Sequence, residues 1–250
     1  MEYNVRKKII ALISAISLLV LIASSDPRKT YLIFRAEAPN HFLTLFLEDN
    51  PNQDMIVPIL VTQQYIESEF DHNAVSSAGA IGTAQIIPQL LQVLLNLEEP
   101  PKQIPIEWAC YAQVKHFNHV WKNHLQRMKK IGKRIGVKPR NHHMVNLFLV
   151  MYIGGERAFG GDETIRRILL EIRHTEPEKE SEHHKPYAVN LYVTKILYNF
   201  GVLSIEKAQF PDELENKNAV IQKQKDIKII LEGLGYDLNK LNKLLMKEIP

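Results

Sequence analysis

The chain has 250 residues, of which 45% are hydrophobic, and a formal net charge of +3 at pH 7. This composition is ordinary for a globular protein and is sufficient to bury a sizeable core. The small net charge says little about a partner, so local clusters of charge matter more. Cys110 is the single cysteine, which excludes an intramolecular disulfide and a cysteine-based zinc site.

The first 25 residues have the pattern of an export signal. Basic residues at positions 6 to 8 precede an uncharged apolar run from residue 9 to residue 23. This run is short for a full bilayer span, which needs roughly 20 residues. We expect residues 1–25 to be a cleaved signal peptide in preference to a signal anchor, with the remainder exported in either case. The alternative is a buried helix at the start of a cytosolic domain, which the lack of amphipathic character disfavours.

Helical patterns dominate the rest of the chain. Residues 26–54 are predicted to form an irregular, partly helical lead-in, meaning the segment that precedes the main domain. Apolar spacing and stop signals then predict helices over residues 57–70, 84–97, 106–136, 142–155, 161–173, 187–203 and 237–249. The charged stretch 174–186 reads as a loop. No strand-like alternation of useful length and no internal repeat is present, so the sequence predicts a mainly α fold.

Three local signals predict where helices begin and end. Pro58 suits the first turn of its helix, because the missing N–H is not needed there. Gly154 and Gly155 are expected to end the apolar helix that precedes them. Asp162 is expected to be the N-cap of the next helix.

Candidate catalytic and ligand-binding residues are most concentrated in residues 67–88, ESEFDHNAVSSAGAIGTAQIIP. Glu67 should lie in the last turn of its helix, where the negative end of the helix dipole disfavours a carboxylate. Apolar neighbours disfavour the charge as well. Both effects favour the neutral carboxylic acid, which is the form that a general acid needs. The alternative is an ordinary solvated glutamate followed by a surface loop.

The residues that follow Glu67 suit a binding loop. Gly79 and Gly82 let the backbone turn sharply and allow a ligand to approach closely. Ser76 and Gln85 offer neutral hydrogen bonds of the kind that sugars and amides accept. The same glycine-rich stretch could hold a small β-hairpin.

This stretch resembles the signature of the soluble lytic transglycosylase family, E-S-x-F-x-x-x-A-x-S-x-A-G-A-x-G-x-x-Q-x-x-P. The signature is filled in order and without a gap by Glu67, Ser68, Phe70, Ala74, Ser76, Ala78, Gly79, Ala80, Gly82, Gln85 and Pro88. Two later segments, MYIGGERAF with Tyr152 and YVTKIL with Tyr192, resemble further family segments. The resemblance implies a lysozyme-like transglycosylase domain over residues 55–200. Residues 201–250 lie outside the resemblance and are expected to form a helical C-terminal extension.

The resemblance also implies an activity. Family members cleave the β-1,4 bond between N-acetylmuramic acid and N-acetylglucosamine in peptidoglycan without adding water. Glu67 would first protonate the leaving oxygen and then take the proton of the muramoyl C6 hydroxyl, which closes a 1,6-anhydro ring. Many glycosidases need two carboxylates, whereas here the nucleophile belongs to the substrate. Ser76, Gln85, Tyr152 and Tyr192 would form the substrate-binding set, with Tyr152 also orienting Glu67. No metal or cofactor is implied.

The sequence departs from the family pattern at three places. Ile153 stands where the family usually has Asn, and Thr83 and Ala84 stand where it commonly has Leu-Met. Ala188 and Val189 replace a Glu-Thr pair. The first two departures should alter the shape and polarity of the groove wall, and the third removes a carboxylate that could hold substrate. Glu67 is unaffected.

Two further clusters have competing interpretations. Histidines at positions 116, 119 and 124, and the pairs 142–143 and 183–184, could bind metal, but without acidic partners nearby we interpret them as solvated or core histidines. No Asp or Glu occurs from residue 108 to residue 155, where the basic residues are Lys115, Lys122, Arg127, Lys129, Lys130, Lys133, Arg134, Lys138 and Arg140. This segment is either a solvated face or a docking surface for peptidoglycan carboxylates, membrane headgroups or an acidic protein.

The sequence therefore predicts an exported, periplasmic enzyme that acts on peptidoglycan glycan strands. It would serve wall turnover or open the wall for a secretion or conjugation apparatus. We expect no nucleic-acid partner, and membrane contact only through the N-terminal segment if that segment is not cleaved. Two alternatives remain, a non-catalytic glycan-binding or scaffold subunit of a cell-envelope apparatus and a hydrolase of the goose-lysozyme type.

Overall fold

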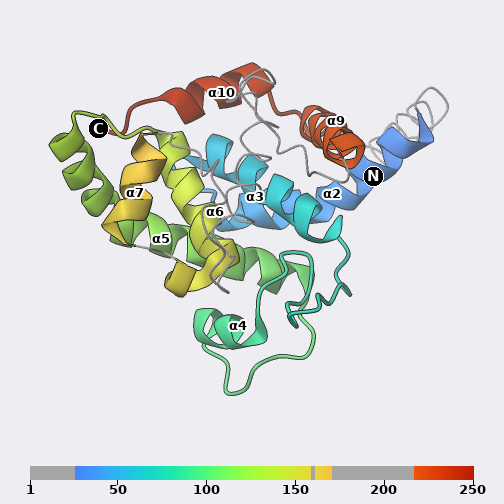
Figure 1. Ribbon diagram of the computed structural model, residues 1–250. Coiled ribbons are helices and arrows are strands. Elements are labelled where there is room, and N and C mark those ends of the chain that lie inside the picture. Colours follow the sequence, from blue (N-terminus) through green and yellow to red (C-terminus); the bar gives the residue numbers. More distant parts are fainter. Residues whose placement is uncertain (1–25, 159–160, 171–216) are drawn as a thin grey trace, which may run out of the picture.

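The computed structural model describes residues 26–158, 161–170 and 217–250. Within those ranges the protein contains eight helices and no strand, which confirms the mainly α fold class (Figure 1). The helices are α2 (Pro27–Phe46), α3 (Gln53–Ser68), α4 (Pro88–Leu95), α5 (Ile106–Ile135), α6 (Asn141–Ala158), α7 (Asp162–Leu169), α9 (Lys217–Gly233) and α10 (Leu238–Met246). The predicted export segment 1–25, the charged stretch 174–186 and the helix expected over residues 187–203 lie outside the described residues.

The lead-in, expected to be irregular and only partly helical, forms one regular helix over residues 27–46. The Asp26 side chain accepts a hydrogen bond from the Arg28 N–H at 3.0 Å, and Pro27 occupies the first helical position. This pair is a strong helix start signal. The helix continues through Pro39 because one of its faces, which includes Leu32 and Leu43, is buried in the core.

α3 is the central helix of the fold and begins one turn earlier than predicted. Pro58 therefore lies in the helix interior rather than in the first turn. An interior proline removes one backbone hydrogen bond. Every residue from 55 to 65 is buried, however, so tertiary packing outweighs that loss.

α5 matches the expected helix closely, whereas the ends of α6 and α7 differ from the expectation. α6 runs through Gly154 and Gly155 to Ala158 instead of ending at the glycines. A glycine costs a helix only about 1 kcal/mol, and residues 141–150 of the same helix are all buried. The N-cap of α7 is Gly161, and Asp162 is the first helical residue, with its carboxylate 2.5 Å from Arg127.

One large hydrophobic cluster joins both ends of the described chain to the central helices. α2, α9 and α10 contribute buried side chains to the cluster that α3, α5, α6 and α7 build, among them Leu32, Leu43, Ile227, Ile230, Leu231, Leu241 and Leu245. α9 packs against both α2 and α3, and Figure 1 shows α9 and α2 next to one another. A smaller cluster, which includes Ile81, Ala84 and Ile104, lies beneath the glycine-rich loop.

The C-terminal segment covers part of the basic region. Lys138 lies 3.1 Å from the carboxylate of Glu248, and Lys129 donates a hydrogen bond to the backbone carbonyl of Pro250. Lys115 donates to the Leu94 carbonyl and Arg127 pairs with Asp162, so the other exposed basic side chains of α5 are Lys122, Lys130, Lys133 and Arg134. The predicted docking of this region on an anionic partner would therefore rest on these four residues.

In the parts of the chain that the structure describes, no helix has both the length and the apolar character needed to cross a membrane.

Candidate functional site

Glu67 lies in the last turn of α3, as predicted, and the backbone immediately after it is strained. Glu69 and Phe70 have φ angles of 53° and 63°. A residue other than glycine in this left-handed region costs roughly 1–2 kcal/mol. Among the described residues the other non-glycine examples are Gln85 and Asn96. Glu69 and Asn96 are the C-caps of α3 and α4, a place where left-handed residues are common but are usually Gly or Asn. Strain of this kind gathers at functional sites, and three of the four examples lie within residues 67–88.

Several contacts hold the strained turn in place. The Glu69 N–H donates to the Tyr65 carbonyl at 2.9 Å, and the buried Phe70 ring packs 5.7 Å from the Tyr65 ring. The Ser68 hydroxyl lies 2.8 Å from the Thr83 carbonyl, with the Gln64 carbonyl as a second acceptor at 3.2 Å. Ser68 thereby ties the end of α3 to the glycine-rich loop.

The glycine-rich loop is folded by its own backbone. Gly79 and Gly82 have φ angles of 80° and 76°, as the sequence suggested. A Cβ atom on Gly82 would lie only 2.8 Å from Cγ2 of Ile104, so this position requires glycine for space as well. The small hairpin that the sequence allowed is present only as two isolated bridges, Val75 with Ile81 and Ile81 with Ile86.

The two predicted substrate-binding side chains of the loop also hold its shape. The Ser76 hydroxyl accepts a hydrogen bond from the Ala80 N–H at 3.0 Å. The Gln85 amide nitrogen donates to the carbonyls of Ala74 and Gly82 at 3.0 and 2.8 Å. Both amide hydrogens of Gln85 are thus used within the loop, which leaves its oxygen to accept from a ligand.

Tyr152 projects from α6 against the same loop. Its hydroxyl donates to the Ala84 carbonyl at 2.5 Å. Burial raises the pKa of Tyr152 well above its usual value, and the negative charge of Glu67 raises it further. The tyrosine is therefore a neutral phenol within electrostatic reach of Glu67. Tyr192, the remaining predicted site residue, lies outside the described residues.

The other acidic groups near Glu67 in sequence are more exposed than Glu67, which is partly buried. The Glu69 side chain is 58% exposed and lies 3.7 Å from the Lys223 ammonium. Asp71 is exposed and accepts a hydrogen bond from the Asn73 N–H at 2.9 Å. Of these three carboxylates, Glu67 alone combines partial burial with charge coupling to Tyr152.

No family model, curated protein or solved structure matches the chain. The site therefore stands on its geometry and on the motif. Of the departures from the family pattern, Thr83 and Ala84 are fully buried. They act through the packing beneath the loop rather than by lining an open groove. The side chain of Ile153, like Ala188 and Val189, lies outside the described residues.

His116 is a site residue that the sequence reasoning did not assign. It is buried on α5, and its ring stacks 5.4 Å from the Tyr152 ring. Gln113, His116, Phe117 and Val120 follow helical spacing and lie on one face of α5. This spacing could have predicted that His116 is buried with its apolar neighbours. Across residues 26–158, 161–170 and 217–250, no group of three or more His, Cys, Asp and Glu side chains is arranged to hold a metal ion.

The buried histidines make stability depend on pH. Burial lowers the pKa of His116 to about 4 and that of His143 to about 3. Below pH 6.5 the unfolded chain binds protons at these residues while the folded protein does not, so the free energy of unfolding falls as the pH falls. The expected loss for each histidine is about 1.4 kcal/mol per pH unit, or about 2 kcal/mol at pH 5.

Urea unfolding between pH 7 and pH 5 measures this dependence. His116→Phe keeps a ring against Tyr152 but cannot titrate, so it should reduce the slope by about half. An unfolding free energy that does not change over this range would show that neither histidine is held neutral by the fold.

Proposed function

We propose that the protein is a peptidoglycan lytic transglycosylase in which Glu67 acts first as general acid and then as general base. The observation that carries the proposal is the placement of Glu67, a partly buried carboxylate in the last turn of α3 that is followed by two left-handed residues and lies within electrostatic reach of the partly buried Tyr152. The resemblance of residues 67–88 to the family signature supports the same assignment.

The proposed reaction needs one carboxylate. Glu67 donates its proton to the glycosidic oxygen, and the N-acetylglucosamine leaving group departs. The Glu67 carboxylate then accepts the proton of the muramoyl C6 hydroxyl while the C6 oxygen bonds to C1. The product is a 1,6-anhydro ring, and no water is consumed. A positioned general acid and base of this kind contributes roughly 10²–10⁴-fold to a rate.

The surrounding residues have distinct roles in this proposal. Tyr152 and Ser68 fix the loop against α6 and α3 through the carbonyls of Ala84 and Thr83. The loop then presents the Gln85 oxygen and the Ser76 hydroxyl to the sugar or its N-acetyl group. Tyr192 belongs to the substrate-binding set through the resemblance alone.

The proposal includes export and a periplasmic location, because the substrate lies outside the cytoplasm and residues 1–25 have the pattern of an export signal. Its partners are glycan strands and, where the enzyme opens the wall for a larger assembly, a secretion or conjugation apparatus. The exposed basic residues of α5 would contribute to docking on the anionic wall.

Mass spectrometry of the products released from purified sacculi tests the reaction. The expected muropeptides are lighter by one water than the products of hydrolysis, because the C6 hydroxyl closes the ring. Hydrated reducing ends alone would instead make the protein a hydrolase of the goose-lysozyme type. Glycan binding without any released product would identify a non-catalytic scaffold.

A further inference from the structure

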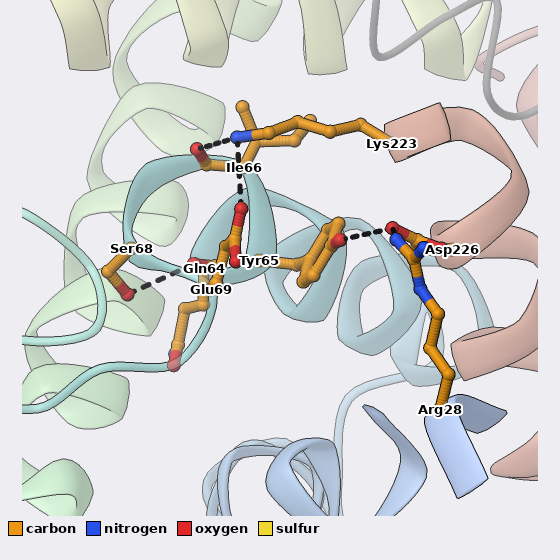
Figure 2. A network of polar contacts seen from close by, with 8 residues as sticks. All are labelled: Arg28, Gln64, Tyr65, Ile66, Ser68, Glu69, Lys223 and Asp226. Carbon is orange, nitrogen blue, oxygen red and sulfur yellow. Dashed lines mark hydrogen bonds and ion pairs between the residues drawn. The ribbon is translucent and has the colours of Figure 1, made fainter. Parts of the chain in front are cut away.

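The turn that carries Glu67 is contacted by a helix far away in the sequence. Asp226 on α9 is a buried carboxylate with a side chain that is only 2% exposed. Its Oδ2 atom accepts hydrogen bonds from the Tyr65 hydroxyl at 2.7 Å and from the Arg28 guanidinium at 2.8 Å. Its Oδ1 atom accepts one from Gln222 at 2.9 Å. Three donors compensate the burial of this charge, and Figure 2 shows Arg28 and Tyr65 converging on it.

The Tyr65 end of this network lies two residues before Glu67. Burial and the hydrogen bond to Asp226 both raise the pKa of Tyr65, so its hydroxyl remains a neutral donor. The Tyr65 ring packs against Phe70, and the Tyr65 carbonyl accepts from the Glu69 N–H. The Tyr65 side chain therefore holds Phe70 directly, and the Tyr65 backbone carbonyl holds Glu69.

A second contact from α9 reaches the turn directly. The Lys223 ammonium lies 3.4 Å from the Ile66 carbonyl and 3.7 Å from the Glu69 carboxylate (Figure 2). Ile66 is among the last four residues of α3, whose carbonyls have no partner inside the helix. A lysine at this place satisfies one of them and complements the negative end of the helix dipole.

We propose that α9 is the positioning element of the Glu67 site, with Lys223 and Asp226 as positioning residues on the two sides of the turn. The inference rests on the proposed role of Glu67. Left-handed conformations at Glu69 and Phe70 persist only where the surroundings over-determine them, and α9 supplies contacts on both sides. Losing one of these contacts lets the turn relax and moves the carboxylate away from the glycosidic oxygen.

Lys223→Gln tests this positioning in the full-length protein. A displacement of about 1 Å far from the chemistry can cost as much as 10²-fold, so we expect kcat to fall about 10-fold while KM stays unchanged. The Lys223 side chain is 40% exposed, so the unfolding temperature should stay near that of the wild type. Lys223→Arg keeps the charge and the donor and should restore most of kcat.

The matched control is Lys228→Gln on the same helix. Its side chain is 63% exposed and lies 3.9 Å from Glu232, a surface pair within α9. This variant should change neither kcat nor the unfolding temperature. Tyr65→Phe removes the other contact while keeping the ring, and it should lower kcat in the same way, together with a modest loss of stability.

Hydrogen exchange of the backbone amides gives a readout that does not need activity. The Glu69 amide should exchange at least about 10-fold faster in Lys223→Gln than in the wild type, because opening of the last turn exposes its hydrogen bond to Tyr65. Amides in the middle of α3 should be unchanged. If the wild type proves inactive on peptidoglycan, faster exchange would still support positioning by α9 while the proposed function fails. Exchange like that of the wild type, or an unchanged kcat despite faster exchange, would overturn the proposal.

Discussion

Glu67→Gln should lower the release of muropeptides from sacculi by at least about 10³-fold. Positioned acid–base catalysis contributes roughly 10²–10⁴-fold, and here one residue would serve both half-steps, so the loss should fall toward the upper end. Glutamine keeps the shape of the side chain and can still form hydrogen bonds, but it can neither donate nor accept the proton. The measurement is the initial rate of soluble muropeptide release.

Asp71→Asn is the control for this prediction. Asp71 is exposed, and its hydrogen bond from the Asn73 N–H can also be accepted by an asparagine oxygen. Its rate should stay close to that of the wild type, and both variants should unfold at the wild-type temperature. Undiminished turnover by Glu67→Gln would remove Glu67 from the mechanism altogether.

A chain that ends at residue 216 should not fold. Removing α9 and α10 uncovers the core and deletes five buried side chains, Ile227, Ile230, Leu231, Leu241 and Leu245. At about 1.5–3 kcal/mol for each side chain, the loss is about 8–15 kcal/mol. Total stabilities of domains are only about 5–15 kcal/mol. Circular dichroism and urea unfolding of the truncated chain would measure the effect.

A matched pair of point variants tests the same contribution without deleting a helix. Ile230 is 1% exposed and Ile221 is 38% exposed on the same helix. Ile230→Ala should cost about 2–5 kcal/mol, whereas Ile221→Ala should change the free energy of unfolding by no more than about 0.5 kcal/mol. Equal costs for the two variants, or a cooperative unfolding transition in the truncated chain, would show that α9 does not complete the core.

The sequence predicted the parts of this protein that depend on local patterns. The length of α5 followed from its apolar spacing, and the position of Glu67 near a helix end followed from the poor helix formers Asp71, His72 and Asn73 after it. The Asp26–Pro27 pair that starts α2 is also recognisable in the sequence, but the prediction did not include it as a helix start. Gly154 and Gly155 gave a wrong helix end because the burial of residues 141–150 of α6 outweighs their low helix propensity.

The supports of the site were not predictable from local patterns. Glu69 and Phe70 are residue types that rarely adopt left-handed conformations, so nothing in their identity signals the strained turn. Asp226 and Lys223 look like ordinary residues of a charged helix, because a single sequence does not show that α9 packs on α2 and α3. Both omissions have one cause, which is that tertiary contacts set the geometry.

The packing of α2 and α3 against α9 and α10 also determines when the protein can fold during synthesis. The Arg28–Asp226 and Asn40–Tyr236 contacts join residues 198 and 196 positions apart, and Asp54 and Lys240 are 186 positions apart. At about 5–20 residues per second, a ribosome needs about 10–40 s to make the chain between such partners. During this time the part of α3 that packs against α9 and α10 has no final partner, and the loop that must close is long. The newborn chain therefore cannot complete its core until α9 and α10 have been made, a delay that is compatible with the export included in the proposed function.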